Sequence, residues 1–320
     1  MVVVMLVNGQ WVDKWDPVQA KDDQGRFVRQ TSSFRHWITP DGSPGPTGNG
    51  GYQAEAGRYH LYVALICPWA SRTLIVRKLK KLESWISLSV VEPFLTEQGW
   101  RFGDFQGATL DHLHQKQYLH ELYTMAASDF TGRATVPVLW DKKNQTMVNN
   151  ESADIIRMLN QAFDHVIDST IDLYPDALSD EIEQWNQDIY QNLNNGVYRA
   201  GFATTQFAYE EAYHHVFDTL DKIESRLHDG RPFIHGASMT ETDIRLFVTL
   251  IRFDAAYYGL FKCNRNLIVQ MPKLSEYLKR LYAIPEIQET VNLTHIKQGY
   301  YSMQSLNPNG IVPIGPDLVV

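Results

Sequence analysis

The tetrapeptide Cys67-Pro68-Trp69-Ala70 is the feature that most constrains the fold of this chain. An apolar, β-rich run from Tyr59 to Ile66 leads into it, and an amphipathic basic run follows from Ser71. We therefore predict a strand followed by a helix with Cys67 at its N-terminus, where proline fits because its missing N–H would lack a partner anyway. The free N–H groups and the positive end of the helix dipole favour the thiolate, so we expect a pKa of Cys67 below the ~8.5 of a free thiol.

The position where a dithiol oxidoreductase carries its second cysteine is occupied by Ala70. Cys67 can therefore attack a sulfur but cannot resolve its own mixed disulfide, and it needs a thiol from solution. The only other cysteine, Cys263, is far away in the sequence. A resolving role and a structural thiol are both open for it, and we favour the structural thiol because cysteine reactivity requires special surroundings.

Length and composition point to an ordinary globular protein. At 320 residues the chain has room for two domains, each with its own core. The net charge of −8 argues against nucleic-acid binding. Two cysteines are too few for a disulfide-built secreted scaffold, and no stretch approaches the ~18 apolar residues of a membrane span, so we expect a cytoplasmic protein. The apolar start, residues 1–7, is interpreted as a strand or a hydrophobic tail.

The chain divides into three parts by pattern. Residues 1–56 are an irregular extension whose Gly/Pro-dense loop, residues 41–51, is either a flap over a site or a surface connection. Residues 57–165 show strand, helix, strand, then an insertion at 97–130, then two strands and a helix. That order predicts a thioredoxin-like α/β domain. Strands are expected at 59–66, 86–91, 135–140 and 146–148, with the last helix opening near Ser152.

Pro137 conflicts with a central strand at 135–140, since proline cannot donate to a β-ladder. A cis Val136–Pro137 bond that ends the strand beside the Cys67 helix would remove the conflict. It would also expose the backbone of Val136 for a peptide ligand to pair with.

Residues 176–320 are expected to be all-helical with an irregular C-terminal tail. Apolar side chains from Tyr209 to Leu227 step by 4, 3, 4, 3 and 4, which is a helical core stripe. Thr240 and Asp243 form a capping box at a helix start, and Met239 staples onto Ile244. No metal site is predicted, because no strand or helix period brings together the three histidines of the insertion, His112, His114 and His120.

The predicted α/β domain followed by a helical domain, with one cysteine at the catalytic helix, resembles the glutathione transferases. Several further motifs match one branch, the glutathionyl-hydroquinone reductases or Xi class, over nearly the whole chain. They are Phe34-Arg35-His36-Trp37-Ile38, PGPTGNGG, Cys67-Pro68-Trp69-Ala70, Gly99-Trp100, Thr135-Val136-Pro137, Asn150-Glu151-Ser152, Asn195-Gly196-Val197-Tyr198 and the C-terminal NPNGI.

The resemblance implies Cys67 as the nucleophile, Tyr198 as the proton donor and acceptor, and Tyr257 and Tyr300 as tyrosines that help to hold the thiolate. It implies a glutathione site made of Trp100, Arg133, Ala134, Thr135, Val136, Glu151 and Ser152. The chemistry of these residues agrees: a helix N-terminus at Ser152 suits the γ-glutamyl carboxylate, and Glu151 can pair with the ammonium group. The chain departs from the family at Ser71 and Gly299, where histidine is common, which bears on the tuning of the thiolate.

The implied activity is a two-step thiol exchange that removes glutathione from glutathionyl-hydroquinones, with glutathione as co-substrate, no metal, and a homodimer as the assembly. Two alternatives share the same fold and nucleophile. One is an omega-like thioltransferase or dehydroascorbate reductase, which turnover on dehydroascorbate and a disulfide would reveal. The other is a glutathione-dependent redox-sensing module, which would stop at one glutathionylated cysteine instead of turning over.

Overall fold

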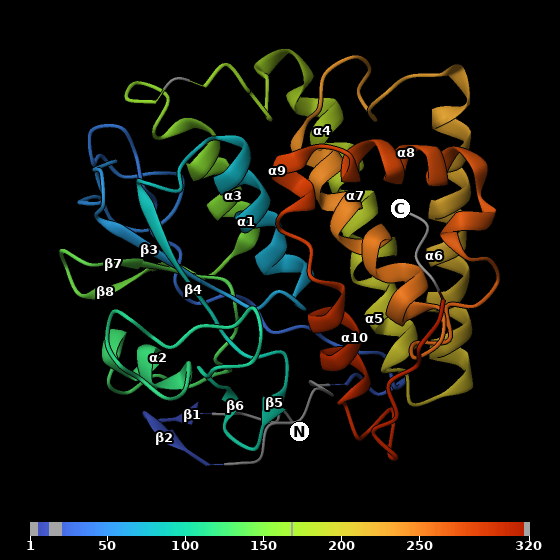
Figure 1. Cartoon of the computed structure of the whole chain (residues 1–320), viewed down its shortest axis with the longest axis horizontal. Coiled ribbons are helices and arrows are strands. Elements are labelled where there is room, and N and C mark those ends of the chain that lie inside the picture. Colours follow the sequence, from blue (N-terminus) through green and yellow to red (C-terminus); the bar gives the residue numbers. More distant parts are fainter. Residues whose placement is uncertain (1–5, 13–20, 168, 317–320) are drawn as a thin grey trace.

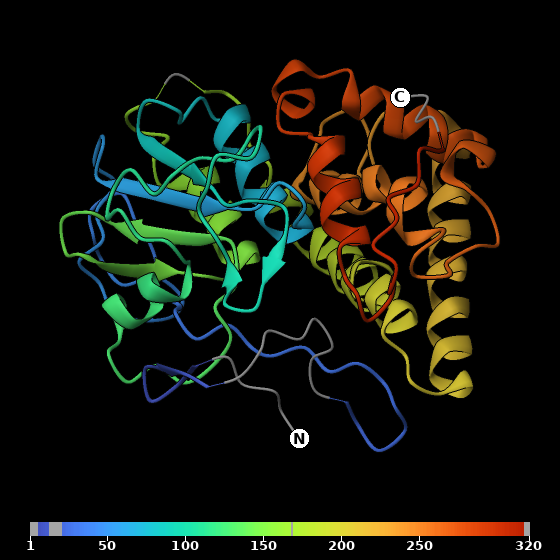
Figure 2. The same ribbon diagram turned by 60° about the horizontal axis from the view of Figure 1, so that its bottom comes forward.

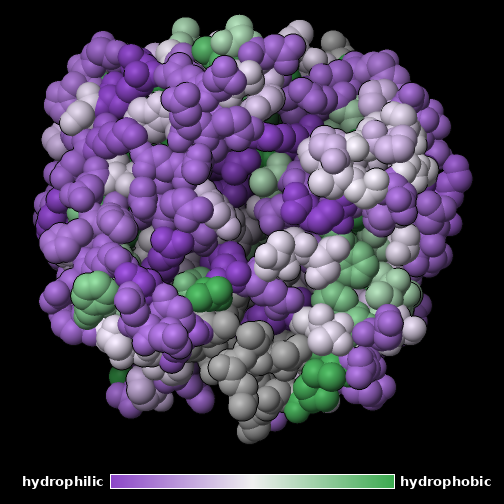
Figure 3. Space-filling view, turned by 180° about the vertical axis from the view of Figure 1, so that it is seen from behind, coloured by the Kyte–Doolittle hydropathy of each residue, from purple (hydrophilic) through white to green (hydrophobic). Residues whose placement is uncertain are grey.

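The computed structural model describes residues 6–12, 21–167 and 169–316. An α/β half, coloured blue to green in Figure 1, lies beside a helical half, coloured yellow to red. Within the described residues no helix is long and apolar enough to cross a membrane. The face shown in Figure 3 is mostly hydrophilic, with its apolar residues in separate patches.

A four-stranded mixed sheet forms the centre of the α/β half, in the order β4-β3-β7-β8. β3 pairs in parallel with β4 and antiparallel with β7, which in turn pairs antiparallel with β8. The helices α1 and α3 pack against each other on one side of the sheet, and α2 lies on the other side (Figure 1). The bounds are Tyr59–Val63 (β3), Ile86–Val90 (β4), Val138–Asp141 (β7), Thr146–Asn149 (β8), Pro68–Leu79 (α1), His120–Ala126 (α2) and Ser152–Gln161 (α3). This is the predicted thioredoxin-like arrangement.

Two strand ends differ from the prediction by three residues. β3 stops at Val63, because the chain then turns and the N–H of Cys67 bonds to the carbonyl of Ala64. β7 starts only at Val138, so Pro137 lies outside the ladder to which it could not donate. The Val136–Pro137 peptide bond is cis, as predicted.

Short hairpins lie at the lower edge of the α/β half in Figure 1. One joins Leu6–Val7 (β1) to Gln10–Trp11 (β2), and the other joins Leu95–Thr96 (β5) to Gly99–Trp100 (β6). The expected N-terminal strand is therefore present at Leu6–Val7, while residues 1–5 of that prediction lie outside the described residues.

The helical half is built around α7, in which all twelve residues are buried. The predicted capping box starts this helix: the Asp243 carboxylate accepts from the backbone N–H of Thr240 at 2.8 Å. The predicted stripe lies on α6, with Val216, Leu220 and Ile223 buried. The bounds are Ser179–Ile189 (α4), Gly196–Gly201 (α5), Gln206–Arg226 (α6), Glu241–Arg252 (α7), Pro272–Tyr282 (α8), Pro285–Gln288 (α9) and Leu293–Tyr301 (α10), with short helical turns at Asp176–Leu178 (η1), Tyr190–Asn194 (η2), Leu227–Asp229 (η3), Phe253–Tyr257 (η4) and Ile268–Gln270 (η5).

Three basic side chains on α1 or directly after it are buried instead of exposed to solvent. Arg72, Arg77 and Lys80 are buried, because α1 lies between the sheet and α7. Each reaches a polar partner: Arg72 donates to Asn194 Oδ1 at 2.6 Å, Arg77 Nε donates to the Ile86 carbonyl at 2.7 Å, and Lys80 Nζ donates to the Ile171 carbonyl at 2.7 Å. Of these, the Arg72–Asn194 hydrogen bond joins the α/β half to the helical half.

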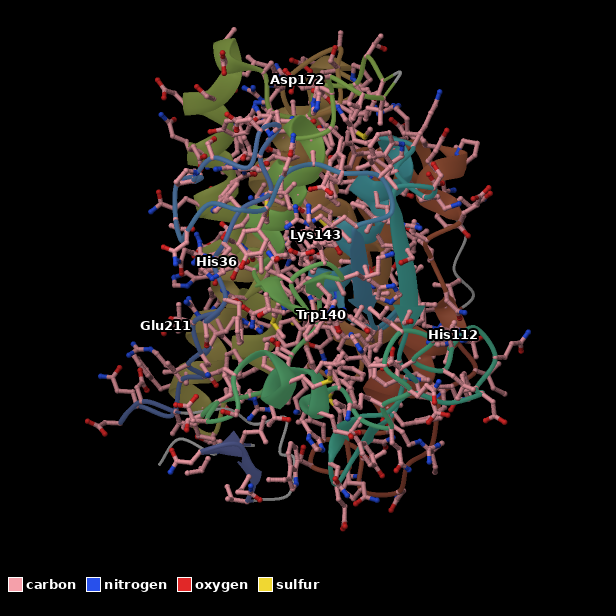
Figure 4. The ribbon with its side chains drawn as sticks, turned by 90° about the vertical axis from the view of Figure 1, so that its left-hand side faces the viewer. His36, His112, Trp140, Lys143, Asp172 and Glu211 are labelled. Carbon is pink, nitrogen blue, oxygen red and sulfur yellow. The ribbon has the colours of Figure 1, made fainter. Side chains whose placement is uncertain are left out.

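The N-terminal extension runs beneath both halves (Figure 2). It touches the helical half where Arg26 pairs with Glu211 of α6, and Figure 4 shows Glu211 beside this part of the chain. The loop at 41–51 folds back on the extension itself, since Trp37 Nε1 donates to Thr47 Oγ1 at 2.8 Å. It lines neither of the cavities at Cys67 described below, which favours the surface connection over the flap.

Candidate active site

Cys67 occupies the N-cap of α1, with extended backbone angles and Pro68 as the first helical residue. Its side chain is partly exposed, and Sγ lies 3.6 Å from the carbonyl oxygen of Val136. The strand-turn-helix step predicted from the sequence therefore brings the sulfur to the open end of α1, next to the cis-proline loop.

Two adjoining cavities open at this point. The polar cavity is lined by Ser32, Asn150, Glu151, Ser152 and Tyr190, among others, and has an open volume of about 860 Å³. The apolar cavity contains Cys67 and is lined chiefly by Phe27, Trp100, Tyr198, Phe202 and Tyr300. Their shared wall consists of Arg29, Trp69, Arg133, Thr135 and Val136. One side suits a charged peptide and the other a flat aromatic group, with the sulfur at the aromatic side.

Opposing effects act on the Cys67 thiol. Burial of the sulfur raises its pKa and is the larger effect, whereas the N–H groups of Ala70 and Trp69 and the cations Arg252 and Arg29 lower the pKa. The predicted net lowering is therefore wrong for the ligand-free protein. The helix N-terminus acts as expected, but the surrounding packing, which the sequence does not reveal, outweighs it.

Arg252 of α7 holds the turn that carries Cys67. It is 2 % exposed, and it donates to the carbonyl oxygens of Ile66 at 2.8 Å and Leu65 at 2.9 Å. It also donates to Ser71 Oγ at 2.6 Å, while that hydroxyl donates to the carbonyl of Cys67 at 3.0 Å. The first departure from the family pattern, Ser71, is thus part of a hydrogen-bonded link between the two halves.

The second departure, Gly299, lies where α10 approaches the same turn. A Cβ atom there would come within 2.4 Å of Ile66 Cδ1 and 2.6 Å of the Pro93 carbonyl oxygen. In this chain glycine is needed at position 299 because of that close approach.

The loop at 133–136 contributes to both cavities. Arg133, Thr135 and Val136 line the shared wall, and Ala134 lines the apolar cavity. Tyr123 of α2 supports this loop, because its hydroxyl donates to the Thr135 carbonyl at 2.8 Å and accepts from the Thr135 N–H at 3.1 Å. Sequence reasoning missed Tyr123, since nothing in the pattern of the insertion indicates this long-range contact.

Glu151 and Ser152 lie at the start of α3, in the polar cavity. Glu151 is the N-cap, and its carboxylate accepts from the Ala153 N–H at 3.1 Å and from Ser32 Oγ at 2.9 Å. The residue is therefore a helix cap and at the same time a charged group on the cavity wall. Ser32, which comes from the extension, was not predicted.

Trp100 is in β6 and lines the apolar cavity together with Cys67, instead of the polar cavity that holds Glu151. It is 9 % exposed, so most of its ring is packed against the protein. Of the seven residues predicted for glutathione, two lie only in the apolar cavity, two only in the polar cavity and three in the shared wall.

The three predicted tyrosines form one hydrogen-bonded chain. The hydroxyl of Tyr300 (α10) lies 2.6 Å from that of Tyr198 (α5) and 2.8 Å from that of Tyr257 (η4). Tyr198 and Tyr300 line the apolar cavity, and Tyr257 is fully buried behind them. Burial raises the pKa of all three, so they are neutral proton donors at physiological pH.

Cys263 lies in the core of the helical half with no exposed surface, and burial raises its pKa to about 12. It is a structural thiol.

The three histidines of the insertion lie apart from one another. His114 contacts Trp140, His120 contacts Tyr118, and His112 lies on the outer loops of the insertion (Figure 4). Among residues 6–12, 21–167 and 169–316, no group of three or more His, Cys, Asp or Glu side chains could hold a metal ion.

Comparison with known proteins places this geometry in a family. The family models of the glutathione S-transferase N-terminal and C-terminal domains match residues 66–162 and 206–280. Glutathionyl-hydroquinone reductase YqjG of Escherichia coli is 51 % identical over 313 residues, which cover 97 % of this chain and 94 % of that protein.

Two solved structures are also similar. The glutathione-bound structure of YqjG has a TM-score of 0.87 at 52 % identity and covers 89 % of this chain and 92 % of that one. Glutathione S-transferase Xi of Phanerochaete chrysosporium has a TM-score of 0.88 at 46 % identity and covers 93 % and 95 %. This chain therefore belongs to the glutathione transferases and, within them, to the Xi class, the glutathionyl-hydroquinone reductases.

Proposed function

We propose that this protein is a glutathione-dependent reductase that removes glutathione from glutathionyl-hydroquinones, with Cys67 as its nucleophile. The observation that carries the proposal is a single accessible cysteine between a polar cavity and an aromatic one. The polar cavity suits glutathione: Glu151 can pair with its ammonium group, the N-terminus of α3 at Ser152 can bind its γ-glutamyl carboxylate, and Val136 can pair with its backbone. The hydroquinone ring would lie among Trp100, Tyr198 and Tyr300.

In the first step the Cys67 thiolate attacks the sulfur of the glutathionyl group. The new S–S bond forms as the aryl C–S bond breaks, and its electron pair stays with the ring, whose carbon carries a proton supplied by Tyr198. General acid assistance of this kind typically contributes ~10²–10⁴-fold. Tyr300, which hydrogen-bonds to Tyr198 and to Tyr257, would stabilise the resulting tyrosinate, and Tyr198 would regain its proton from solvent through the cavity that it lines.

In the second step a free glutathione thiolate attacks the Cys67–glutathione disulfide, which releases oxidised glutathione and regenerates Cys67. The net result is a two-electron reduction of the ring carbon. A raised pKa of Cys67 makes its thiolate scarcer at neutral pH, but it also makes that thiolate intrinsically more nucleophilic, so the exchange does not require a strongly acidic thiol.

The assembly and setting are also proposed here. We infer that residues 57–165 form the glutathione-binding domain and residues 176–320 the substrate and dimerisation domain. We also infer that the protein is a cytoplasmic homodimer that needs no metal, nucleic acid or membrane. The two cysteines, neither in a disulfide, fit a reducing compartment, and the net charge of −8 gives no electrostatic basis for binding nucleic acid.

Mass spectrometry tests the proposal. The wild-type protein, mixed with a glutathionyl-hydroquinone and no free glutathione, should gain one glutathione on Cys67 and lose it when glutathione is added. Cys67→Ser should gain no adduct and show no turnover, whereas the matched control Cys263→Ser should react like the wild type. Turnover of the substrate by Cys67→Ser would contradict the mechanism.

A further inference from the structure

Arg29 is a charged residue in the wall between the two cavities, and the reaction described above assigns it no contact with the substrate. Its guanidinium carbon lies 4.7 Å from the ring centre of Trp69, 5.1 Å from that of Tyr198 and 5.3 Å from that of Phe27. Its Nε donates to Asn195 Oδ1 at 2.8 Å. The side chain is therefore fixed over the aromatic residues of the apolar cavity.

The guanidinium of Arg29 is only partly paired within the described residues. Among the described residues it forms no ion pair with a carboxylate, and its buried Nη2 has no hydrogen-bond partner. A buried N–H donor without a partner costs about 1–3 kcal/mol, and a ligand oxygen that accepted from Nη2 would remove this cost. An arginine with one nitrogen anchored and another free is arranged to receive an anionic oxygen.

We propose that Arg29 binds the hydroxyl oxygen of the hydroquinone that is adjacent to the breaking C–S bond, and stabilises the negative charge that reaches it. The inference rests on the proposed function. The aromatic surroundings of the guanidinium favour this oxygen over a carboxylate of glutathione, whose charged groups are expected beside Glu151 and Ser152, which line only the polar cavity.

Tyr198 gives its proton to the ring carbon that bears sulfur, and the neighbouring hydroxyl becomes a ketone as its own proton leaves to solvent. The Cys67 thiolate then attacks the glutathionyl sulfur, the C–S bond breaks, and its electron pair moves through the ring carbon onto the ketone oxygen. Arg29 donates to that oxygen as it becomes an anion. Removing one donor to such an oxygen typically lowers kcat by ~10²–10³-fold.

The test compares two substrates that both form the Cys67–glutathione disulfide. For Arg29→Met, kcat with a glutathionyl-hydroquinone should fall by about 100-fold. The second substrate is the mixed disulfide of glutathione and 2-mercaptoethanol, which has no aryl oxygen, and kcat for its reduction should change by less than about threefold. The loss should shrink for chlorinated hydroquinones, because their oxygen anion needs less stabilisation. Arg29→Lys, which keeps the charge, should recover part of the rate.

Arg26→Met is the matched control, because Arg26 lies in the same segment but pairs with Glu211 and lines neither cavity. It should leave both reactions nearly unchanged. An equal loss of both reactions in Arg29→Met would assign Arg29 to glutathione or to the thiolate, and no loss in either would remove it from the reaction. Both outcomes overturn the inference, whereas failure of the wild type on the aryl substrate would overturn the proposed function itself.

Discussion

Replacement of Arg252 by methionine should destabilise the protein at the interface between its two halves. The substitution removes the donors to the carbonyl oxygens of Leu65 and Ile66 and to Ser71 Oγ, all in the segment that carries Cys67. A lost hydrogen bond to a buried acceptor costs about 1–1.5 kcal/mol, and the cost is higher when the donor is charged. Methionine, in turn, no longer buries a charge, which offsets part of the loss.

The expected net decrease in the free energy of unfolding is about 3 kcal/mol, measured by chemical denaturation with fluorescence detection. The matched control is Arg280→Met, because Arg280 is exposed and, among the residues that the structure describes, donates only to the Pro232 carbonyl, at 3.0 Å. That control should change stability by less than about 0.5 kcal/mol.

A second measurement isolates the effect on Cys67. Because Arg252 lowers the pKa of the Cys67 thiol, its loss should slow alkylation of Cys67 at pH 8. If Arg252→Met were as stable as Arg280→Met and reacted with iodoacetamide at the wild-type rate, the role assigned to this buried cation would be refuted.

Two further predictions concern the thiol and the helix cap. Because burial raises the pKa of Cys67, the thiol stays protonated to higher pH than usual. The rate of Cys67 alkylation in the ligand-free Cys263→Ser variant should therefore still rise above pH 9, and a plateau below pH 8 would contradict the dominance of burial. Thr240→Ala should lower the free energy of unfolding by about 1 kcal/mol through loss of the α7 cap, whereas Thr240→Ser should keep most of the wild-type stability. Equal stability of Thr240→Ala and the wild type would show that the capping box contributes nothing.

Short-range features were predictable because neighbouring residues decide them. Cys67 at the start of α1, the capping box of α7 and the stripe of α6 each depend on spacings within a few turns of helix. The cis bond before Pro137 followed from the inability of proline to donate in a ladder, although the strand itself began later than predicted. The order of these elements was sufficient to indicate the α/β and all-α halves.

The neighbours of Cys67 were decided by tertiary packing. Tyr198 and Tyr300 are 102 residues apart and meet only because α5 and α10 pack around the same cavity. Arg29 and Ser32 reach the site from the extension, and Arg252 reaches it from α7, with no periodic signal in the sequence. The sequence by itself determined that Cys67 lies at a helix N-terminus, which lowers its pKa. Only the folded structure determined that burial has the larger effect on this pKa, since burial depends on segments distant along the chain.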